Sequence, residues 1–435
     1  MECYRLAVPE TRGSEDGRML PLGVYVMKSY LPSTKPPIVM LLGGPGGTAD
    51  STVAALGWHP TRIWRDVIIL EQRGVGVSAN FCADYPEYWY QNVAFVDDED
   101  QQWEIALQGL EDCFDEARAR GIRVESYNTT ENAADVADLR QALKLEELDI
   151  WAVSYGTALA QAYIELEPGR VRRALFDGTV DIEVNLAQRM VPSFLMSLEA
   201  AWTDCTLEEL CNETETTFTD RLLEQITSYN EKPLKLDIED LDYPWGFSGS
   251  VEGSDILTIV HSNLYLDYSH TYLPHLFDQI EARSNLTIVS ELKWLSESWI
   301  SDGMFYATRC HMPRASAQEI AEVISAHGLI AEEFYLEDLN TICERIGIGS
   351  NPSLESYSEV FDGQILIISG RTDPITPLNL ALGLRDRYPG ATYLNIPFGG
   401  HGPSYSLPCG QDIAANFFNR GEKGFARSCD QRADS

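Results

Sequence analysis

Hydrophobic residues gather in short runs that alternate with amphipathic segments along much of the chain. Several runs are continuously apolar, which is typical of strands buried on both faces of a sheet. The runs predicted to form strands are 23–31, 37–42, 67–70, 149–153, 173–176, 364–369 and 391–396, and apolar positions at helical spacing predict helices over 132–144, 155–166 and 411–418. This alternation implies an α/β fold with a mostly parallel, doubly wound sheet.

The alternation stops between residues 183 and 355. This region is helix-prone, acidic and rich in aromatic residues, and no comparable strand run appears before Gln364. Strand and helix signals then resume with two more strands, which favours an insertion into one domain over a separate domain. We predict core segments over 1–182 and 356–435, with 183–355 forming a helical lid over the carboxyl edge of the sheet.

The charge of the chain limits its partners. The 435 residues include 67 acidic and 32 basic side chains, for a formal net charge of -35. Such a surface repels nucleic acid and anionic lipid, so neither is expected as a partner. No apolar run approaches the roughly 18 to 20 residues of a membrane-spanning helix, so membrane insertion is not expected either.

Ser154 stands between a predicted buried strand and a predicted helix. A sharp strand-to-helix turn brings the residues two before and two after its nucleophile close together, and Ala152 and Gly156 are both small. We predict that Ser154 is a nucleophile and that the amide of Tyr155, at the start of the helix, donates to an oxyanion. A structural serine is the alternative interpretation.

A glycine-rich loop, Gly43 to Gly47, directly follows the predicted strand 37–42. Glycines allow backbone amides to turn inward without a Cβ atom in the way. We predict that the second oxyanion donor is Gly44, with Gly46 as second choice. A phosphate-binding loop is disfavoured, because the lysine and hydroxyl residue that such a loop requires do not follow.

A nucleophilic serine needs a histidine base and an acid that orients the base, and in hydrolase sheets the acid precedes the histidine in the chain. His401 follows the last predicted strand within Gly399 to Gly402, where small neighbours give the ring room. Asp373 follows an apolar strand and is our preferred acid. Asp177 also follows a strand and is the other candidate.

The nine cysteines form no CxxC pair, which gives little support to a zinc or dithiol site, and no metal or cofactor is expected. From Cys82 onward they fall into four consecutive couples that each close a modest loop. Spacing alone leaves disulfides and ordinary buried cysteines equally open. The first ten residues contain neither a basic start nor an apolar region, so the protein is either cytoplasmic or its signal segment was trimmed.

Five motifs in order resemble one family: LLGGPGG (41–47), EQRGVGVS (71–78), VSYGT (153–157), GRTDPITP (370–377) and GGHG (399–402). Together they resemble the α/β-hydrolases of the proline iminopeptidase and tripeptidyl aminopeptidase group, nearly end to end. The resemblance implies a catalytic triad of Ser154, Asp373 and His401, and a lid that shapes the substrate site. We also expect Arg73 to brace the oxyanion loop.

The C-terminal part resembles the tripeptidyl aminopeptidase branch, whose exported members carry cysteines in similar places. The resemblance therefore implies four disulfides and a periplasmic or secreted protein, with a cytoplasmic one as the alternative. The implied pairs are Cys82–Cys113, Cys205–Cys211, Cys310–Cys343 and Cys409–Cys429, which leaves Cys3 over.

One difference between this sequence and the family pattern concerns how the substrate is bound. Family members that cleave from a free N-terminus place a carboxylate near the lid cysteine Cys310, to bind the substrate ammonium, but Met312 stands at that position. Other lid carboxylates are Asp302, Glu319 and Glu322. The favoured function is a serine aminopeptidase that acts on peptides through an acyl-enzyme. The alternatives are an esterase or small-amide hydrolase with an aromatic lid pocket, and a non-catalytic binding protein on the same scaffold.

Overall fold

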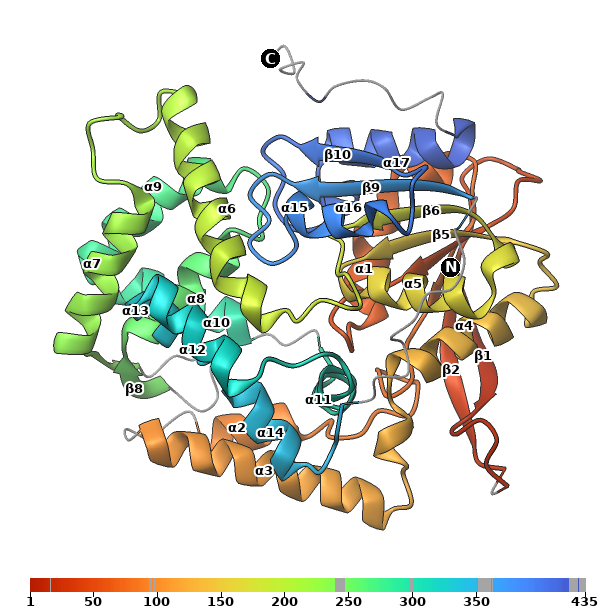
Figure 1. Cartoon of the computed structure of the whole chain (residues 1–435), viewed down its shortest axis with the longest axis horizontal. Coiled ribbons are helices and arrows are strands. Elements are labelled where there is room, and N and C mark those ends of the chain that lie inside the picture. The colour runs from red at the N-terminus through yellow and green to blue at the C-terminus, as the bar shows by residue number, and fades with distance from the viewer. Residues whose placement is uncertain are drawn as a thin grey trace.

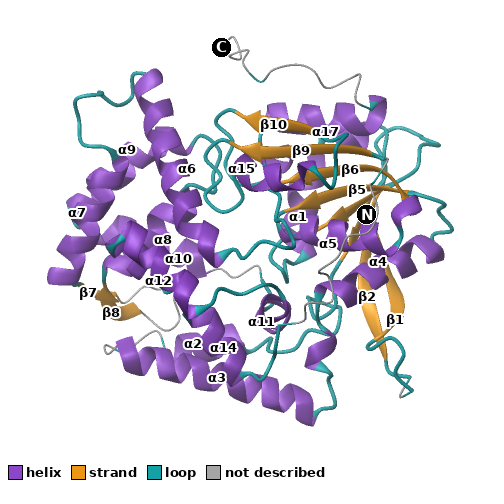
Figure 2. Ribbon diagram, viewed as in Figure 1, coloured by secondary structure: helices purple, strands orange, loops and turns teal. Residues whose placement is uncertain are grey.

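The central element is an eight-stranded sheet. The computed structural model describes residues 1–15, 17–93, 96, 99–238, 247–296, 300–350, 361, 363–421 and 429. The strand order is β1 (Glu2–Pro9), β2 (Met19–Met27), β4 (Val67–Leu70), β3 (Ile38–Leu41), β5 (Leu148–Val153), β6 (Val171–Asp177), β9 (Gln364–Gly370) and β10 (Thr392–Ile396) (Figures 1 and 2). The neighbours from β4 to β10 pair in parallel, whereas β1 and β2 are antiparallel. The predicted α/β fold with a mostly parallel sheet is therefore confirmed.

The middle strands are buried on both faces, as their continuous apolar runs predict. In β3, Ile38 and Met40 belong to the core on one face, and Val39 and Leu41 to the core on the other. Helices α1 (Ala49–Ala55) and α17 (Pro408–Arg420) contribute to the first core, and α3 (Glu99–Ala119), α4 (Thr129–Ala142) and α5 (Tyr155–Leu166) to the second. The sheet is thus enclosed between two helical layers.

Three strands are absent from the sequence-based prediction. Strand β1 lies at the edge of the sheet and its first four side chains are exposed, so it lacks an apolar run. Strands β7 (Leu234–Ile238) and β8 (Phe247–Val251) form a small antiparallel hairpin inside the region predicted to be helical. The expectation that the region 183–355 contains no strand is therefore wrong.

A second hydrophobic core lies beside the sheet and includes buried residues from Val191 to Leu336. Its helices are α6 (Ala187–Leu207), α7 (Phe218–Glu231), α8 (Gly253–Asn263), α9 (Ser269–Glu281), α10 (Asn285–Ser296), α12 (Ala317–His327) and α13 (Leu329–Glu332). We call this helical body the lid (Figure 1). Its predicted limits, 183 and 355, remain predictions, and residue 355 lies outside the described residues.

A further layer of helices lies beneath the lid. It contains α2 (Tyr85–Asn92), α3, α11 (Asp302–His311) and α14 (Asp338–Arg345), and α11 lies near the centre of the molecule (Figure 1). Buried residues of α11 and α14 belong to the core of the sheet rather than to that of the lid. The short helices α15 (Leu378–Ala381) and α16 (Pro403–Ser406) follow β9 and β10.

Four disulfides link the same cysteine pairs that the family resemblance implies. They join Cys82 to Cys113, Cys205 to Cys211, Cys310 to Cys343 and Cys409 to Cys429, and Cys3 is free and exposed. The Cys310–Cys343 bond ties α11 to α14. Within the described residues, no helix has both the length and the apolar character that crossing a bilayer requires.

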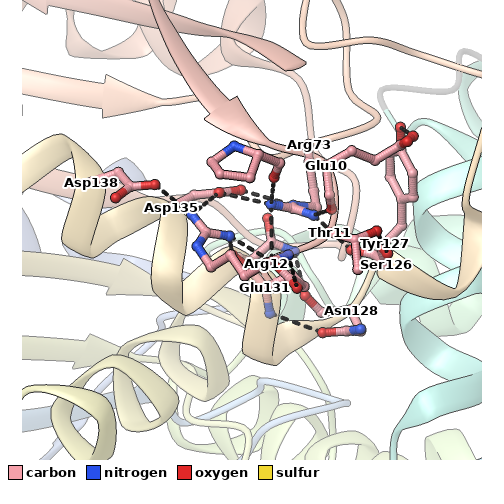
Figure 3. A network of polar contacts seen from close by, with 12 residues as sticks. Glu10, Thr11, Arg12, Arg73, Ser126, Tyr127, Asn128, Glu131, Asp135 and Asp138 are labelled. Atoms are coloured by element: carbon pink, nitrogen blue, oxygen red, sulfur yellow. Dashed lines mark hydrogen bonds and ion pairs between the residues drawn. The ribbon is translucent and has the colours of Figure 1, made fainter. Parts of the chain in front are cut away.

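The Arg73 guanidinium lies at the centre of a buried polar network (Figure 3). It donates two hydrogen bonds of 2.8 Å to the Asp135 carboxylate and others to the carbonyl oxygens of Glu10 and Ser126. Arg12 donates to Asp135 from the solvent side. Arg73 therefore joins the end of β4 to α4, and the expectation that it braces the glycine loop is wrong.

Replacing Asp135 with asparagine is expected to destabilise the protein by about 3 kcal/mol, because the buried Arg73 guanidinium then loses its nearer charge partner and keeps only Glu131 at 3.5 Å. Asp135 is 1% exposed, so water cannot take its place. Chemical denaturation monitored by tryptophan fluorescence measures the change. Asp138→Asn is the matched control, since Asp138 binds Arg12 at the surface of the same helix. Equal stability losses in the two variants would contradict the expectation.

Candidate active site

Ser154 occupies a strained turn between β5 and α5. Its backbone has φ 55° and ψ -127°, a left-handed φ that costs free energy in a residue with a side chain. A Cβ atom on Gly156 would lie 2.1 Å from the carbonyl oxygen of Leu41, so only glycine fits there. The amide of Ser154 donates to the carbonyl oxygen of Asp177 on the neighbouring strand. The turn therefore has the tight geometry that the small residues predict.

The glycine loop packs against Ser154. A Cβ atom on Gly43 would lie 2.9 Å from Ser154 Cβ and 3.5 Å from its Oγ, so Gly43, which the sequence did not single out, borders the hydroxyl. The amide of Gly46 already donates to Gln72 Oε1, whereas no hydrogen bond from the amide of Gly44 occurs within the described chain. The Gln72 side chain also donates to the carbonyl oxygen of Leu42. Gln72, rather than Arg73, braces this loop.

Asp373 and His401 are hydrogen-bonded to each other. His401 Nδ1 lies 2.9 Å from Asp373 Oδ2, and the Asp373 side chain is fully buried. The other oxygen of the carboxylate accepts from the amides of Ile375 and Thr376, and the Thr376 hydroxyl donates to Oδ2. The carboxylate is thus held in place by its own loop. The sequence analysis did not identify Thr376, which lies only three residues beyond the acid.

The loops that carry Ser154 and His401 meet at the same edge of the sheet. A Cβ atom on Gly402, the residue after His401, would lie 3.4 Å from Val153 Cγ1, and Val153 precedes Ser154. On the other side, a Cβ atom on Gly178 would lie 3.1 Å from His401 Cε1. Gly178 directly follows the aspartate whose carbonyl binds the Ser154 amide. Contacts on both flanks therefore bring the three predicted triad residues to one place.

Asp177, the other candidate acid, has a different set of partners. Its carboxylate accepts hydrogen bonds from the amide and hydroxyl of Ser404, and it makes no bond to the imidazole of His401. The Ser404 hydroxyl also accepts from Trp151 Nε1 at 2.9 Å. Burial raises the pKa of Asp177 to about 7. Asp177 therefore ties β6 to the segment after the histidine instead of orienting the ring.

The lid holds the histidine loop directly. The amide of His401 donates to the carbonyl oxygen of Tyr265, and the Tyr265 ring meets the imidazole edge-on at a centroid distance of 5.0 Å. The amide of Gly400 donates to the Asp267 carboxylate. On the opposite side, the Ser301 amide donates to the carbonyl oxygen of Gly46. Lid and lid-adjacent segments thus contact both the base and the glycine loop.

Two carboxylates shape the proton affinity of His401. Burial alone would lower the pKa of the imidazole, but the charge and hydrogen bond of Asp373, helped by the charge of Asp177, raise it above the ordinary value of 6.5. Burial would likewise raise the pKa of Asp373, but His401 and Thr376 hold it below its usual value. An ionised Asp373 and a titratable His401 are therefore expected at neutral pH.

The raised pKa of His401 predicts the acid side of the pH profile. A protonated imidazole cannot accept a proton, so kcat/KM should fall as the pH drops through a midpoint above 6.5. Measuring kcat/KM from about pH 5 to about pH 9 tests this expectation. A midpoint clearly below 6.5 would contradict it, provided that circular dichroism shows a folded protein at each pH.

The three carboxylates that the sequence analysis named within the predicted lid segment 183–355 differ in their availability. Glu319 is engaged by the amide and hydroxyl of Ser316, and Glu322 is exposed. Asp302 begins α11 and is partly buried, and it forms no hydrogen bond or ion pair to another described residue. Burial raises its pKa to about 6. Met312 is uncharged and packs in the core at 5% exposure, so it cannot bind a substrate ammonium.

Comparison with known proteins identifies the family. The sequence model of the alpha/beta hydrolase fold matches residues 36–206, and that of the TAP-like proteins matches residues 329–428. The chain is an α/β-hydrolase with a TAP-like C-terminal part. The two matched segments contain the glycine loop, Ser154, Asp373 and His401, so the family assignment rests on the same residues as the geometry above.

Characterised relatives of this α/β-hydrolase are distant. It is 30% identical over 193 residues to the putative hydrolase YuaR of Escherichia coli, covering 42% of this chain and 36% of that protein. It is 30% identical over 210 residues to the serine protease Hip1 of Mycobacterium tuberculosis, covering 43% and 38%. The tripeptidyl aminopeptidase of Streptomyces coelicolor is 32% identical over 150 residues, covering 32% and 27%. The aligned region thus spans 27% to 38% of the length of these curated relatives.

Solved structures of other hydrolases align over most of the chain. The meta-cleavage product hydrolase CumD of Pseudomonas fluorescens shares 12% identity, with a TM-score of 0.40 and coverage of 92% and 94%. An esterase of Exiguobacterium antarcticum also shares 12%, with a TM-score of 0.37 and coverage of 92% and 93%. These values are too low to bear on substrate or mechanism, and the family assignment rests on the two sequence models.

Proposed function

We propose that this α/β-hydrolase is a serine hydrolase that releases residues from the free N-terminus of peptides. The observation that carries the proposal is the Asp373–His401 hydrogen bond at the edge where Ser154 sits in its strained turn. In this mechanism Ser154 Oγ attacks the substrate carbonyl carbon, and His401 takes the hydroxyl proton at Nε2, because Nδ1 faces Asp373. The same proton then passes to the leaving amine.

The remaining groups act on the charge that develops during the reaction. The carbonyl oxygen becomes an oxyanion, which the amides of Gly44 and Tyr155 stabilise with hydrogen bonds, each worth roughly 10² to 10³ in rate. Water then attacks the acyl-enzyme, with His401 again accepting a proton. Asp373 keeps the imidazole in the correct tautomer and stabilises its charged form. No step requires a metal or cofactor.

Asp302 supplies the counter-charge that Met312 lacks. A substrate ammonium in a closed site is costly unless a carboxylate meets it. Asp302 is partly buried, has no cation beside it among the described residues, and directly follows Ser301, which is hydrogen-bonded to the glycine loop. An ammonium bound there would lie close to the oxyanion donors. This position favours cleavage near a free N-terminus.

A carboxylesterase or small-amide hydrolase is the second candidate. It is favoured by a cluster of aromatic rings where the lid meets the base: Phe194, Tyr265 and Phe334 all contact the ring of His261, and Tyr265 also contacts His401. Burial lowers the pKa of His261 to about 4, so this ring is neutral and adds no charge to the wall. Such a wall suits an apolar acyl group.

One assay separates these functions. Wild-type protein and Ser154→Ala are compared on a free-amine proline arylamide, its N-acetylated form and a short-chain aryl ester. A strong, serine-dependent preference for the free amine supports the peptidase. Indifference to acetylation together with fast ester turnover supports the esterase instead, and the absence of serine-dependent turnover on all three would leave a binding protein.

Asp302→Asn should raise KM for the free-amine arylamide about 10- to 100-fold, because the ammonium loses its ionic partner. Turnover of the aryl ester, which carries no ammonium, should change far less. Glu322→Gln is the matched control, since Glu322 is an exposed carboxylate of the lid. An equal loss on both substrates would show that Asp302 acts on the fold rather than on the ammonium.

The four disulfides also support an oxidising compartment for this enzyme, because such bonds rarely persist in a reducing cytosol. We therefore place its activity outside the cytoplasm. A titration of native protein with a thiol reagent should detect about one free thiol, that of Cys3. Several reactive thiols in protein taken from its native host would argue for a cytoplasmic enzyme.

A further inference from the structure

Arg309, in the last turn of α11, is a partly buried cation without a partner among the described residues. The side chain is partly buried and forms no hydrogen bond or ion pair with any described residue. Burial lowers the pKa of its guanidinium to about 10, and no carboxylate of the described residues lies close enough to offset that effect. An unpaired guanidinium that has lost part of its hydration carries a free-energy cost. An anionic ligand would remove this cost.

Three other arginines with little exposed side chain have carboxylate partners. Arg65 pairs with Asp149, and Arg73 pairs with Asp135. Arg140 pairs with Glu167 through two hydrogen bonds of 2.8 and 3.0 Å. Arg309 differs from these three arginines because no described carboxylate reaches its guanidinium.

The position of Arg309 on its helix connects it with the active site. Gly303, Met304, Ala307, Thr308 and Cys310 are the buried positions of α11. The opposite face of the helix carries Asp302, Phe305, Tyr306 and Arg309, at the spacing i, i+3, i+4, i+7. The amide nitrogen of Phe305 would lie 3.4 Å from a Cβ atom on Gly46, so this face begins at the glycine loop.

Asp302 and Arg309 are therefore two unpaired, opposite charges on one helix face. They are two turns apart, a rise of about 10 Å along the axis. An extended peptide covers about 3.3 to 3.6 Å per residue, so about three residues span that distance. Because Asp302 lies at the glycine loop, an ammonium bound there leaves the other end of a short peptide near Arg309.

We propose that Arg309 binds a substrate carboxylate, and that the enzyme is selective for short peptides of about three residues with both ends free. This inference rests on the proposed peptidase function. The planar guanidinium can donate two parallel hydrogen bonds to one carboxylate, which gives both binding energy and orientation. Longer chains and amidated peptides lose this contact.

The test compares a tripeptide with a free C-terminal carboxylate and the same tripeptide as its C-terminal amide. The wild-type enzyme should prefer the free acid by about 10- to 100-fold in kcat/KM, mainly through KM. Arg309→Met should bring the two substrates within about twofold of each other, and Arg309→Lys should keep part of the preference. Arg221→Met is the matched control, since Arg221 is a lid arginine paired with Asp278 and Glu281, and it should keep the full preference.

Two results would overturn the proposal: equal kcat/KM for acid and amide in the wild-type enzyme, or a preference that survives Arg309→Met. If Arg309→Met does not fold, the acid-to-amide ratio of kcat/KM in Arg309→Lys and in the wild-type enzyme still tests the proposal. A second pair of substrates, an aryl hemisuccinate and an aryl butyrate, separates this proposal from the peptidase function. Failure to cleave either tripeptide, with an Arg309-dependent preference for the hemisuccinate, would refute the peptidase and keep the carboxylate site.

Discussion

Replacing Ser154 with alanine is expected to lower kcat by about 10⁵- to 10⁶-fold on every substrate that the wild-type enzyme turns over. The hydroxyl is the atom that attacks, and no other described residue can form the same acyl-enzyme at this position. Stability should rise slightly or stay unchanged, because the strained turn remains and only one oxygen is lost. Steady-state kinetics and thermal unfolding of the same preparations measure both effects.

Ser228→Ala is a suitable control for Ser154→Ala. Ser228 lies on the lid helix α7, where its hydroxyl accepts a hydrogen bond from Arg283. Its removal should leave kcat unchanged. A Ser154→Ala protein with more than about a tenth of wild-type activity would refute the nucleophile assignment and the acyl-enzyme mechanism with it.

Asp373→Asn is expected to lower kcat by about 10⁴-fold, with little change in fold. An asparagine amide in this place can donate a hydrogen bond to His401 Nδ1, which stabilises the tautomer that cannot accept the serine proton. The pH profile should change as well: loss of the carboxylate removes the main cause of the raised pKa of His401, so the acid limb should move to lower pH. Kinetics across the pH range report both effects.

Asp177→Asn is the matched comparison, because this second buried aspartate was the rival acid. Its partners are on Ser404, so the variant should lose less than about 10-fold in kcat. The acid limb should shift down only slightly, since the charge of Asp177 is a minor cause of the raised pKa of His401. The reverse pattern, with Asp177→Asn as the more damaging change, would assign the orienting acid to Asp177.

Much of the sheet could be predicted because its middle strands are buried on both faces. Each of the seven predicted apolar runs overlaps an observed strand, and the run at 67–70 coincides with β4. Strand β1 escaped prediction because it lies at the sheet edge and exposes its polar side chains. The hairpin β7–β8 escaped because short strands inside a helical region leave no distinct periodicity.

The candidate site was predictable where function restricts the residue type locally. A strained turn needs small neighbours, so Ser154 stands out, and the order serine, acid, histidine directs attention to Asp373 and His401. Gln72 and Arg73 are adjacent in the sequence, and nothing in their spacing tells which one turns toward the glycine loop. The sequence offered Asp302 only as one of three carboxylates and did not single out Arg309, because a missing partner is visible only when all neighbours are placed.

The contacts between the lid and the loop that carries His401 constrain how substrates enter. Tyr265 holds His401 through its carbonyl oxygen and its ring, Asp267 holds the amide of Gly400, and Tyr268 stacks on Phe398. If this segment of the lid moved away from the sheet, it would displace His401 from the Asp373 carboxylate. Substrates should therefore enter through another part of the lid. A protease cut within residues 264–268 should abolish activity, although every catalytic side chain remains chemically intact.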